Sequence, residues 1–157
     1  MREYEFRGKT CHSNEWRYGS LIVTGKDSIH VVEVNAEDIV QDGHHLRQNS
    51  DRPTWVVPET VGQYTSYVDK NGSRIYEGDI VVDENGQTAY VAWFPQECGF
   101  VLVYEKYDSR LGHRNRGNGY CFDVNLEIIG NIHDNPDFVP WWNKKKDLED
   151  LGKTNKN

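Results

Sequence analysis

Two Asn-Gly pairs, at residues 71–72 and 85–86, divide the stretch DKNGSRIYEGDIVVDENGQTAYVAWF into pieces too short for ordinary helices. Asparagine and glycine tolerate the positive φ angles that tight hairpin turns require, and the pieces between the pairs are rich in residues that strands favour. The pattern therefore predicts a β ribbon in which one strand, IYEGDIVV, is followed by another, QTAYVAWF.

Short strands separated by turns continue on both sides of this ribbon. Residues 4–23 alternate apolar and polar side chains around the polar run HSNE, which predicts a hairpin, and IHVVEV supplies a third strand. Residues 55–57 are strand-like up to Pro58, and FVLVYEKY and YCFDVNLEIIG are two later strands. Because no βαβ alternation occurs, we expect an all-β protein, either a small barrel or a bent-sheet sandwich of short antiparallel strands with a short C-terminal helix or tail.

The length of 157 residues fits one domain with an appended tail. We expect a mainly-β domain over residues 1–139 and a partly helical or disordered tail over residues 140–157. Lys144 to Lys146 lie near the start of this tail, where positive charge opposes the helix dipole. A helix there is therefore expected to form only when it is docked on something.

Charge and apolar content limit the partners and the compartment. A formal net charge of -7 argues against a broad phosphate-binding surface. The sequence contains no run of about 20 apolar residues, which a membrane-spanning helix needs, so we expect a cytoplasmic protein without membrane contact. Cys11, Cys98 and Cys121 have no C-x-x-C spacing and are predicted to be reduced, mostly buried thiols, with no cofactor.

The acidic cluster Glu77, Asp79, Asp83 and Glu84 is the first candidate for catalysis, because paired carboxylates can act as acid and base. Glu77 and Asp79 lie beside a glycine at a predicted hairpin edge, however, whereas a hydrolase pair faces across a cleft. We expect these charges to stay in solvent and to protect a β edge. The six histidines have no spacing that would place two ligands together locally, so no metal site is predicted.

The loop at residues 109–119, SRLGHRNRGNG, is locally basic and contains Arg110, Arg114 and Arg116 but no acidic residue. Together with an exposed aromatic side chain such as Trp93 or Tyr104, it could contact single-stranded nucleic acid. The net acidity of the chain argues against this role, so nucleic acid is an alternative partner and not the favoured one.

At residues 58–82, PETVGQYTSYVDKNGSRIYEGDIVV, the chain strongly resembles the YopX family of small proteins encoded in phages and prophages. The early FRGK and the closing EIIGNIHDNPDFV agree with the same family, so the resemblance covers nearly all of residues 2–139. The positions that match the family pattern are Gln63, Tyr64, Thr65, Asp69, Asn71, Gly72, Ile75, Tyr76, Glu77, Gly78, Asp79, Ile80 and Val81. The chain departs from the pattern at Ser66, where the family usually has glycine, so the turn after Thr65 is expected to have a different backbone.

The resemblance implies a mainly-β protein of phage origin, and it names no reaction and no catalytic residue. We interpret the signature as turn and strand-entry residues, in which Gly72 and Gly78 fix the backbone while Tyr76, Ile80 and Trp93 pack.

Three hypotheses for the function follow. The leading one is a non-enzymatic phage accessory protein that binds an unknown protein partner and self-associates as a homo-oligomer, with Trp141 and Trp142 as anchors on a neighbouring subunit. The alternative is a nucleic-acid-binding small β-barrel module. A hydrolase around Glu77 and Asp79 comes third.

Overall fold

The computed structural model of the chain describes residues 3–25, 28–32, 54–95, 98–105 and 125–142. Strands dominate these residues, as the sequence predicts. The packing of the backbone divides the chain into two compact units, Met1–Ser66 and Tyr67–Asn157. Each unit is described by itself below.

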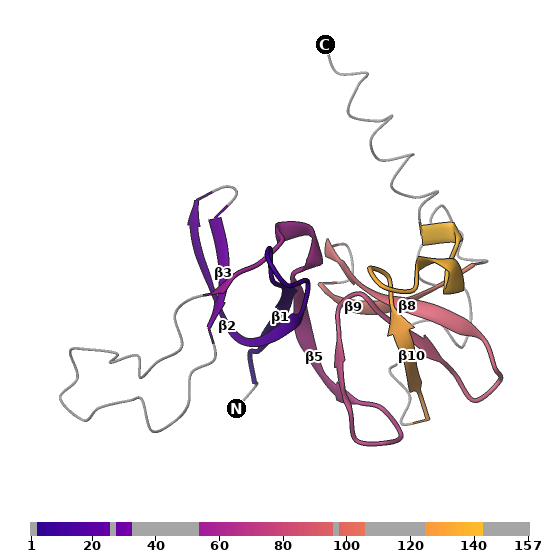
Figure 1. Ribbon diagram of the computed structural model, residues 1–157. Helices are drawn as coiled ribbons and strands as arrows, with labels where there is room; N and C mark the ends of the chain where they lie inside the picture. Colours follow the sequence, from indigo (N-terminus) through magenta and orange to yellow (C-terminus); the bar gives the residue numbers. More distant parts are fainter. Residues whose placement is uncertain (1–2, 26–27, 33–53, 96–97, 106–124, 143–157) are drawn as a thin grey trace, which may run out of the picture. The chain divides into compact units, whose positions relative to one another are not determined.

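The first unit consists mainly of antiparallel strands (Figure 1). Its elements are β1 (Phe6–Lys9), β2 (Trp16–Gly25), β3 (Ser28–Val32), β4 (Thr54–Trp55), the 3-10 helix η2 (Pro58–Thr60) and the first part of β5 (Gly62–Val68). Together with β6 (Arg74–Tyr76), these strands are hydrogen-bonded in the order β4-β3-β2-β1-β5-β6.

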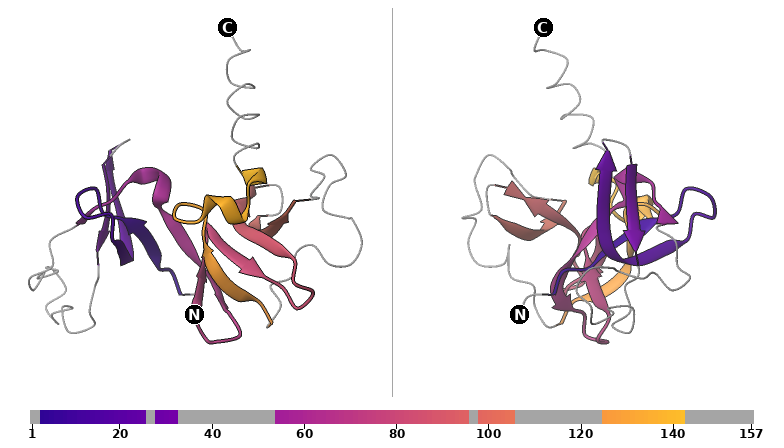
Figure 2. Two further views of the ribbon diagram at one scale, coloured as in Figure 1. Left: turned by 45° about the vertical axis from the view of Figure 1, so that its right-hand side comes forward. Right: turned by 90° about the vertical axis from the view of Figure 1, so that its left-hand side faces the viewer.

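The hairpin predicted for residues 4–23 is confirmed. Strands β1 and β2 pair antiparallel, with Lys9 opposite Trp16, and Asn14 in the connecting turn has a φ of 58°. The third predicted strand is β3, which pairs with β2 so that Leu21 lies opposite Val31. Figure 2 shows β2 and β3 running side by side. Local turn chemistry is thus enough to set the order of the first three strands.

The strand expected at residues 55–57 is shorter than predicted. β4 ends at Trp55, Val56 forms an isolated bridge, and Pro58 begins η2. Proline suits the first turn of a helix because its fixed φ is helical and its missing N–H would have no helical partner there. The hydroxyl of Thr60 accepts a hydrogen bond from the backbone N–H of Lys9 at 2.9 Å, which ties η2 to β1.

The interior of the first unit contains charged as well as apolar side chains. Val31 and Val56 are each only 2% exposed. Arg7 and Lys9 are buried as well, and their charged ends lie over the ring of Trp16 at 4.5 and 5.4 Å from its centroid. Cation–π contacts of this kind offset part of the hydration that the two charges lose.

Ser66, the last residue of the first unit, has a φ of 74°. This left-handed region costs an L-residue with a side chain roughly 1–2 kcal/mol, whereas glycine enters it freely. The backbone of Ser66 is therefore in the left-handed conformation that glycine favours, and not in the extended conformation usual for a strand residue.

The second unit contains β7 (Asp79–Val82), β8 (Thr88–Phe94), β9 (Gly99–Tyr104), β10 (Glu127–Asn131) and the 3-10 helix η5 (Pro136–Phe138). Its four strands form an antiparallel sheet in the order β10-β7-β8-β9. Both Asn-Gly pairs form turns as predicted, and their glycines, Gly72 and Gly86, have φ values of 82° and 75°.

Both faces of this sheet are covered by buried side chains. One cluster contains Ile75, Val81, Ala89, Val91, Leu102 and Leu126, and the other contains Ile80, Tyr90, Val101, Val103 and Val139. Because successive side chains of a strand point to opposite faces, a sheet covered on both sides needs nearly continuous apolar strands. This requirement explains the runs IVV, AYV and VLV in β7, β8 and β9.

The prediction of an all-β class is confirmed, and the described residues form two antiparallel sheets without a closed barrel. The prediction of one strand over IYEGDIVV is wrong, because β6 ends at Tyr76 and β7 begins at Asp79. Residues 33–53, the basic loop at residues 109–119 and residues 143–157 lie outside the described residues. The domain boundary expected at residue 139 stays a prediction.

Candidate functional site

The centre of the signature, Tyr76 to Asp79, is a tight turn between β6 and β7. Gly78 has a φ of 84°, which a residue with a side chain would adopt only with strain. The carboxylate of Asp79 accepts a hydrogen bond from the backbone N–H of Tyr76 at 2.8 Å, and Asp79 is only 2% exposed. The expectation that Asp79 stays in solvent is therefore wrong, because its charge closes the turn from the inside.

The same turn is hydrogen-bonded to two distant segments of the second unit. The N–H of Gly78 donates to the carbonyl of Val91 at 2.8 Å, and its carbonyl accepts from the N–H of Ile132 at 2.9 Å. The Glu77 carboxylate accepts from the backbone N–H of Trp93 at 3.3 Å. Each carboxylate of the suspected catalytic pair thus has a backbone donor of its own, which is an arrangement that stabilises a turn.

Asp69 and Asp83 close the two Asn-Gly turns in the same way, within the repeated pattern D-x-N-G. Oδ1 of each aspartate accepts the backbone N–H groups of the residues two and four positions later, at 2.8 Å for Asp69 and 2.9 Å for Asp83. These side-chain bonds mimic backbone turn bonds and hold the chain in the reversed direction. Both aspartates therefore have a structural role.

Asp69 also reaches a distant strand, because its Oδ2 accepts the N–H of Ile128 in β10 at 3.3 Å. Burial acts to raise the pKa of Asp69, which is 5% exposed. The backbone N–H groups of Ser73, Ile128 and Asn71 outweigh this effect, so the pKa of Asp69 lies below its ordinary value.

We expect the second unit to lose stability in acid through Asp69. A carboxyl group whose pKa is lowered by folding stabilises the fold above its unfolded pKa of about 3.9, and this contribution is lost as the pH falls through the folded pKa. Urea unfolding between about pH 6 and pH 2.5 should therefore show a fall in stability below about pH 4. Asp69→Asn, which cannot ionise, should show a shallower fall, and an equal fall in both proteins would contradict the assignment.

The remaining candidates for catalysis or metal binding are not assembled into a site. Cys11 and Cys98 are exposed free thiols, so the prediction of mostly buried cysteines is wrong for these two, and Cys121 lies outside the described residues. Within the described ranges, no three His, Cys, Asp or Glu side chains are grouped so that they could hold a metal. In the same ranges no helix is long and apolar enough to cross a membrane.

The residues of the nucleic-acid hypothesis are only partly described. Arg110, Arg114 and Arg116 lie outside the described residues. Trp93 is 42% exposed and packs edge-on against Phe100 with ring centroids 5.1 Å apart. It is therefore accessible for stacking, and contact with nucleic acid stays a prediction.

Trp141 and Trp142, the predicted anchors, are half-buried in their own chain. Both pack against the sheet face that contains Ile80 and Tyr90, and the ring of Trp142 meets His133 edge-on with centroids 6.4 Å apart. A role as anchors on another subunit stays a prediction. Their packing gives both indoles a part in the core of the second unit.

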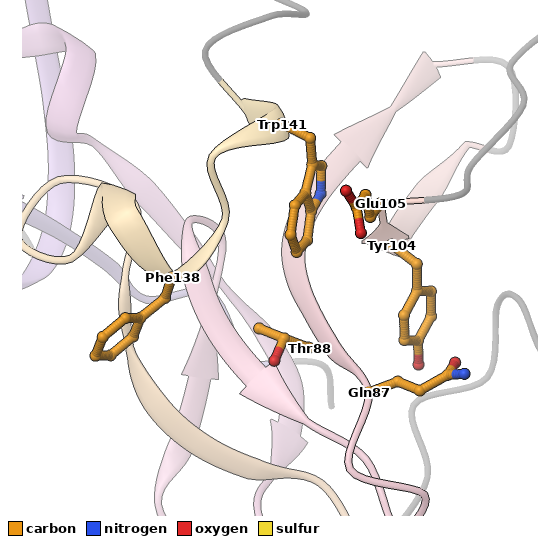
Figure 3. Close-up of a pocket in the computed structure, with 6 residues that line it drawn as sticks. All are labelled: Gln87, Thr88, Tyr104, Glu105, Phe138 and Trp141. Atoms are coloured by element: carbon orange, nitrogen blue, oxygen red, sulfur yellow. The ribbon is translucent and has the colours of Figure 1, made fainter.

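A pocket of about 330 Å³ opens beside Trp141. We call it the Trp141 pocket, and its lining residues, drawn in Figure 3, are Gln87, Thr88, Tyr104, Glu105, Phe138 and Trp141. The indole Nε1 of Trp141 is buried and has no hydrogen-bond partner among the described residues. These residues come from the start of β8, the end of β9 and the C-terminal segment, so no local motif could have identified the pocket as a unit.

Tyr104 connects this pocket to the Asp83 turn. Its hydroxyl donates to Oδ2 of Asp83 at 3.3 Å. Burial, the charge of Asp83 and this hydrogen bond together raise the pKa of Tyr104 to about 12. The phenol is therefore neutral near pH 7 and is engaged by Asp83, which makes Tyr104 a weaker stacking candidate than Trp93.

The fold and these sites define a mainly-β protein whose signature carboxylates, Asp69, Glu77 and Asp79, accept backbone hydrogen bonds in turns. The chain belongs to the YopX family, because the family model described as YopX protein matches residues 5–139. Among solved structures it is similar to protein EF1440 from Enterococcus faecalis, with 17% sequence identity and a TM-score of 0.49 over 88% of this chain and 99% of the other. No curated protein matches the chain.

Proposed function

We propose that this protein is a non-enzymatic phage or prophage accessory protein that acts through protein contacts and self-associates through strand β9. The proposal depends mainly on one observation. In the part of the chain that the structure describes, β9, Gly99–Tyr104, is at the end of the four-stranded order, and its sequence GFVLVY contains no charge and no proline. An uncharged apolar edge strand readily pairs with another chain.

The other edge strands of the two sheets, β4, β6 and β10, are less suited to pairing with another chain. β4 has two residues and β6 has three, while β10 contains Glu127 and an irregular register between Ile128 and Gly130. Short, charged or bulged edges are the usual means by which proteins block edge-to-edge pairing. β9 has none of these features, so a second copy pairing antiparallel with it would give a closed two-fold dimer.

The use of the acidic residues supports the non-enzymatic part of the proposal. Asp69, Asp79, Asp83 and Glu77 each accept backbone hydrogen bonds that hold turns or strands. A carboxylate committed in this way is poorly placed to exchange protons with a substrate. The family resemblance supports action in the cytoplasm of a bacterial host, the setting in which phage-encoded proteins work.

The self-association can be tested by sedimentation velocity over a wide concentration range. We expect a species of twice the chain mass of 18.2 kDa. Phe100→Lys places a charge on the edge strand and should shift the protein to monomer. Trp93→Lys places the same charge opposite Phe100, but on the interior strand β8. Because β8 is not an edge strand, this variant should remain dimeric.

Circular dichroism should establish that both variants are folded before their masses are compared. A wild-type protein that is monomeric at every concentration would refute self-association, and a Phe100→Lys variant that stays dimeric would refute the role of β9. Truncation at Pro140 is a less specific test of the Trp141 and Trp142 anchors, because it also removes both indoles from the core of the second unit.

A further inference from the structure

The Trp141 pocket is lined by three aromatic side chains, Tyr104, Phe138 and Trp141, and by one carboxylate, Glu105. Phe138 is 48% exposed and Trp141 is half-buried, while Glu105 is exposed. In the described part of the chain Glu105 has no ion pair and no hydrogen bond. The lining of the pocket therefore includes aromatic rings, whose faces have negative π density, and a carboxylate that has no partner among the described residues.

The described residues around the pocket are acidic as well. No lysine or arginine is among its described lining residues. The carboxylate of Asp83 accepts the hydrogen bond of the Tyr104 hydroxyl, and Asp137, the residue before Phe138, is exposed. Among the described residues these charges repel an anionic ligand and attract a cation, in the same sense as the net charge of -7 of the chain.

The buried Nε1 of Trp141 is a second feature of the pocket that a bound ligand would affect. An indole N–H that is buried without an acceptor is destabilising, because it has lost its hydrogen bond to water. In Figure 3 this nitrogen is on the edge of the ring that faces Glu105. A carboxylate has several acceptor positions, so a rotated Glu105 side chain could accept from the indole and from a bound cation at once.

From this geometry we propose that the Trp141 pocket binds an organic cation, an ammonium or guanidinium group, against Phe138 and Trp141 with Glu105 as its counter-ion. A volume of about 330 Å³ accommodates such a group together with a few attached carbons. The group can belong to a small molecule or to a lysine or arginine side chain of another protein. The proposal does not depend on dimer formation through β9.

The binding can be followed through the indole N–H signals of the five tryptophans in ¹H–¹⁵N spectra of the full chain. Trp141→Phe removes one signal and so assigns it. We expect this signal to shift saturably with N-acetyl-arginine methylamide, N-acetyl-lysine methylamide and tetramethylammonium. The neutral analogue N-acetyl-citrulline methylamide should cause no comparable shift.

A matched pair of variants tests the counter-ion. Glu105→Gln should weaken arginine-amide binding about five- to tenfold, which corresponds to roughly 1 kcal/mol. Glu59→Gln makes the same change in net charge at an exposed residue of the first unit and should leave the affinity unchanged. No saturable shift up to about 50 mM of any cation, the range in which a weak single site is occupied, would overturn the proposal. Equal affinity of Glu105→Gln and wild type would also overturn it.

The two sources of the cation are distinguished by peptide length. If a partner protein supplies the side chain, arginine- or lysine-centred heptapeptides should bind more tightly than the single amides. If a free small molecule is the ligand, the heptapeptides should bind no better than the amides, and the choice among ammonium and guanidinium probes should govern the affinity.

Discussion

Replacing Asp79 by alanine should destabilise the second unit by about 3 kcal/mol, because it leaves a buried backbone donor without its charged acceptor. Asp79 is 2% exposed, and its carboxylate accepts the N–H of Tyr76 at 2.8 Å. The turn that it closes is also hydrogen-bonded through Gly78 to Val91 and Ile132. Loss of the carboxylate should therefore weaken the attachment of β7 to its neighbours as well as the turn. Urea unfolding combined with hydrogen exchange at the amides of β7 and β8 measures both effects.

Two control variants separate the effect of the Asp79 charge from that of its hydrogen bond, and the effect of Asp79 from that of the neighbouring Glu77. Asp79→Asn retains an acceptor oxygen of nearly the same shape and should cost about 1 kcal/mol. Glu77→Ala removes a partly exposed acceptor at a longer distance, 3.3 Å, and should cost less than about 1 kcal/mol. If Asp79→Ala were within about 0.5 kcal/mol of wild type, the range of an ordinary surface change, the structural role of this signature residue would be refuted.

Replacing Gly8 by alanine should destabilise the first unit by about 2 kcal/mol through overpacking. A Cβ at this position would lie 2.9 Å from Cβ of Val56 and 3.0 and 3.1 Å from its two methyl groups. Val56 is 2% exposed, and β1 is held between β2 and β5, so neither side can move freely. The stability of the first unit should be measured by hydrogen exchange at the amides of β1 and β2.

A double-mutant cycle identifies the contact responsible. Val56→Ala alone should cost about 2 kcal/mol because it leaves a cavity. Combined with Gly8→Ala, it removes the two methyl groups at 3.0 and 3.1 Å and leaves Cβ of residue 56 at 2.9 Å. The double variant should therefore cost somewhat less than the sum of the single changes. Additive costs would show that the two methyl groups do not contribute to the clash. Gly86→Ala, where nothing lies within 4 Å of the new Cβ, reports the cost of positive φ without crowding.

These results assign structural roles to much of the YopX signature. Asp69, Gly72, Gly78 and Asp79 all act in turns of the second unit. Because the signature residues are concentrated in turns, we interpret the signature as the part of the sequence that specifies the fold. The surfaces proposed for binding, β9 and the Trp141 pocket, use Phe100, Glu105 and Trp141, which lie outside the signature stretch at residues 58–82.

The turns at the Asn-Gly pairs were predictable because their chemistry is local. Oδ1 of each aspartate accepts N–H groups no more than four positions away, and each glycine supplies a positive φ at the point where the chain reverses. The split of IYEGDIVV could not be predicted in the same way. A strand and a turn are both compatible with YEGD, and the turn depends on Val91 and Ile132, which are 13 and 54 positions from Gly78.

The sequence by itself determined the all-β class, the strand-and-turn pattern of the predicted hairpins and the family. Short alternating segments and turn residues act over a few positions, so these features can be read along the chain. Only the tertiary structure decided that Asp79 is buried, that Asp69 bonds to Ile128, that Trp141 packs on its own sheet and that Glu105 meets it in a pocket. Each of these depends on residues distant in the chain that meet only when both faces of the sheet are covered.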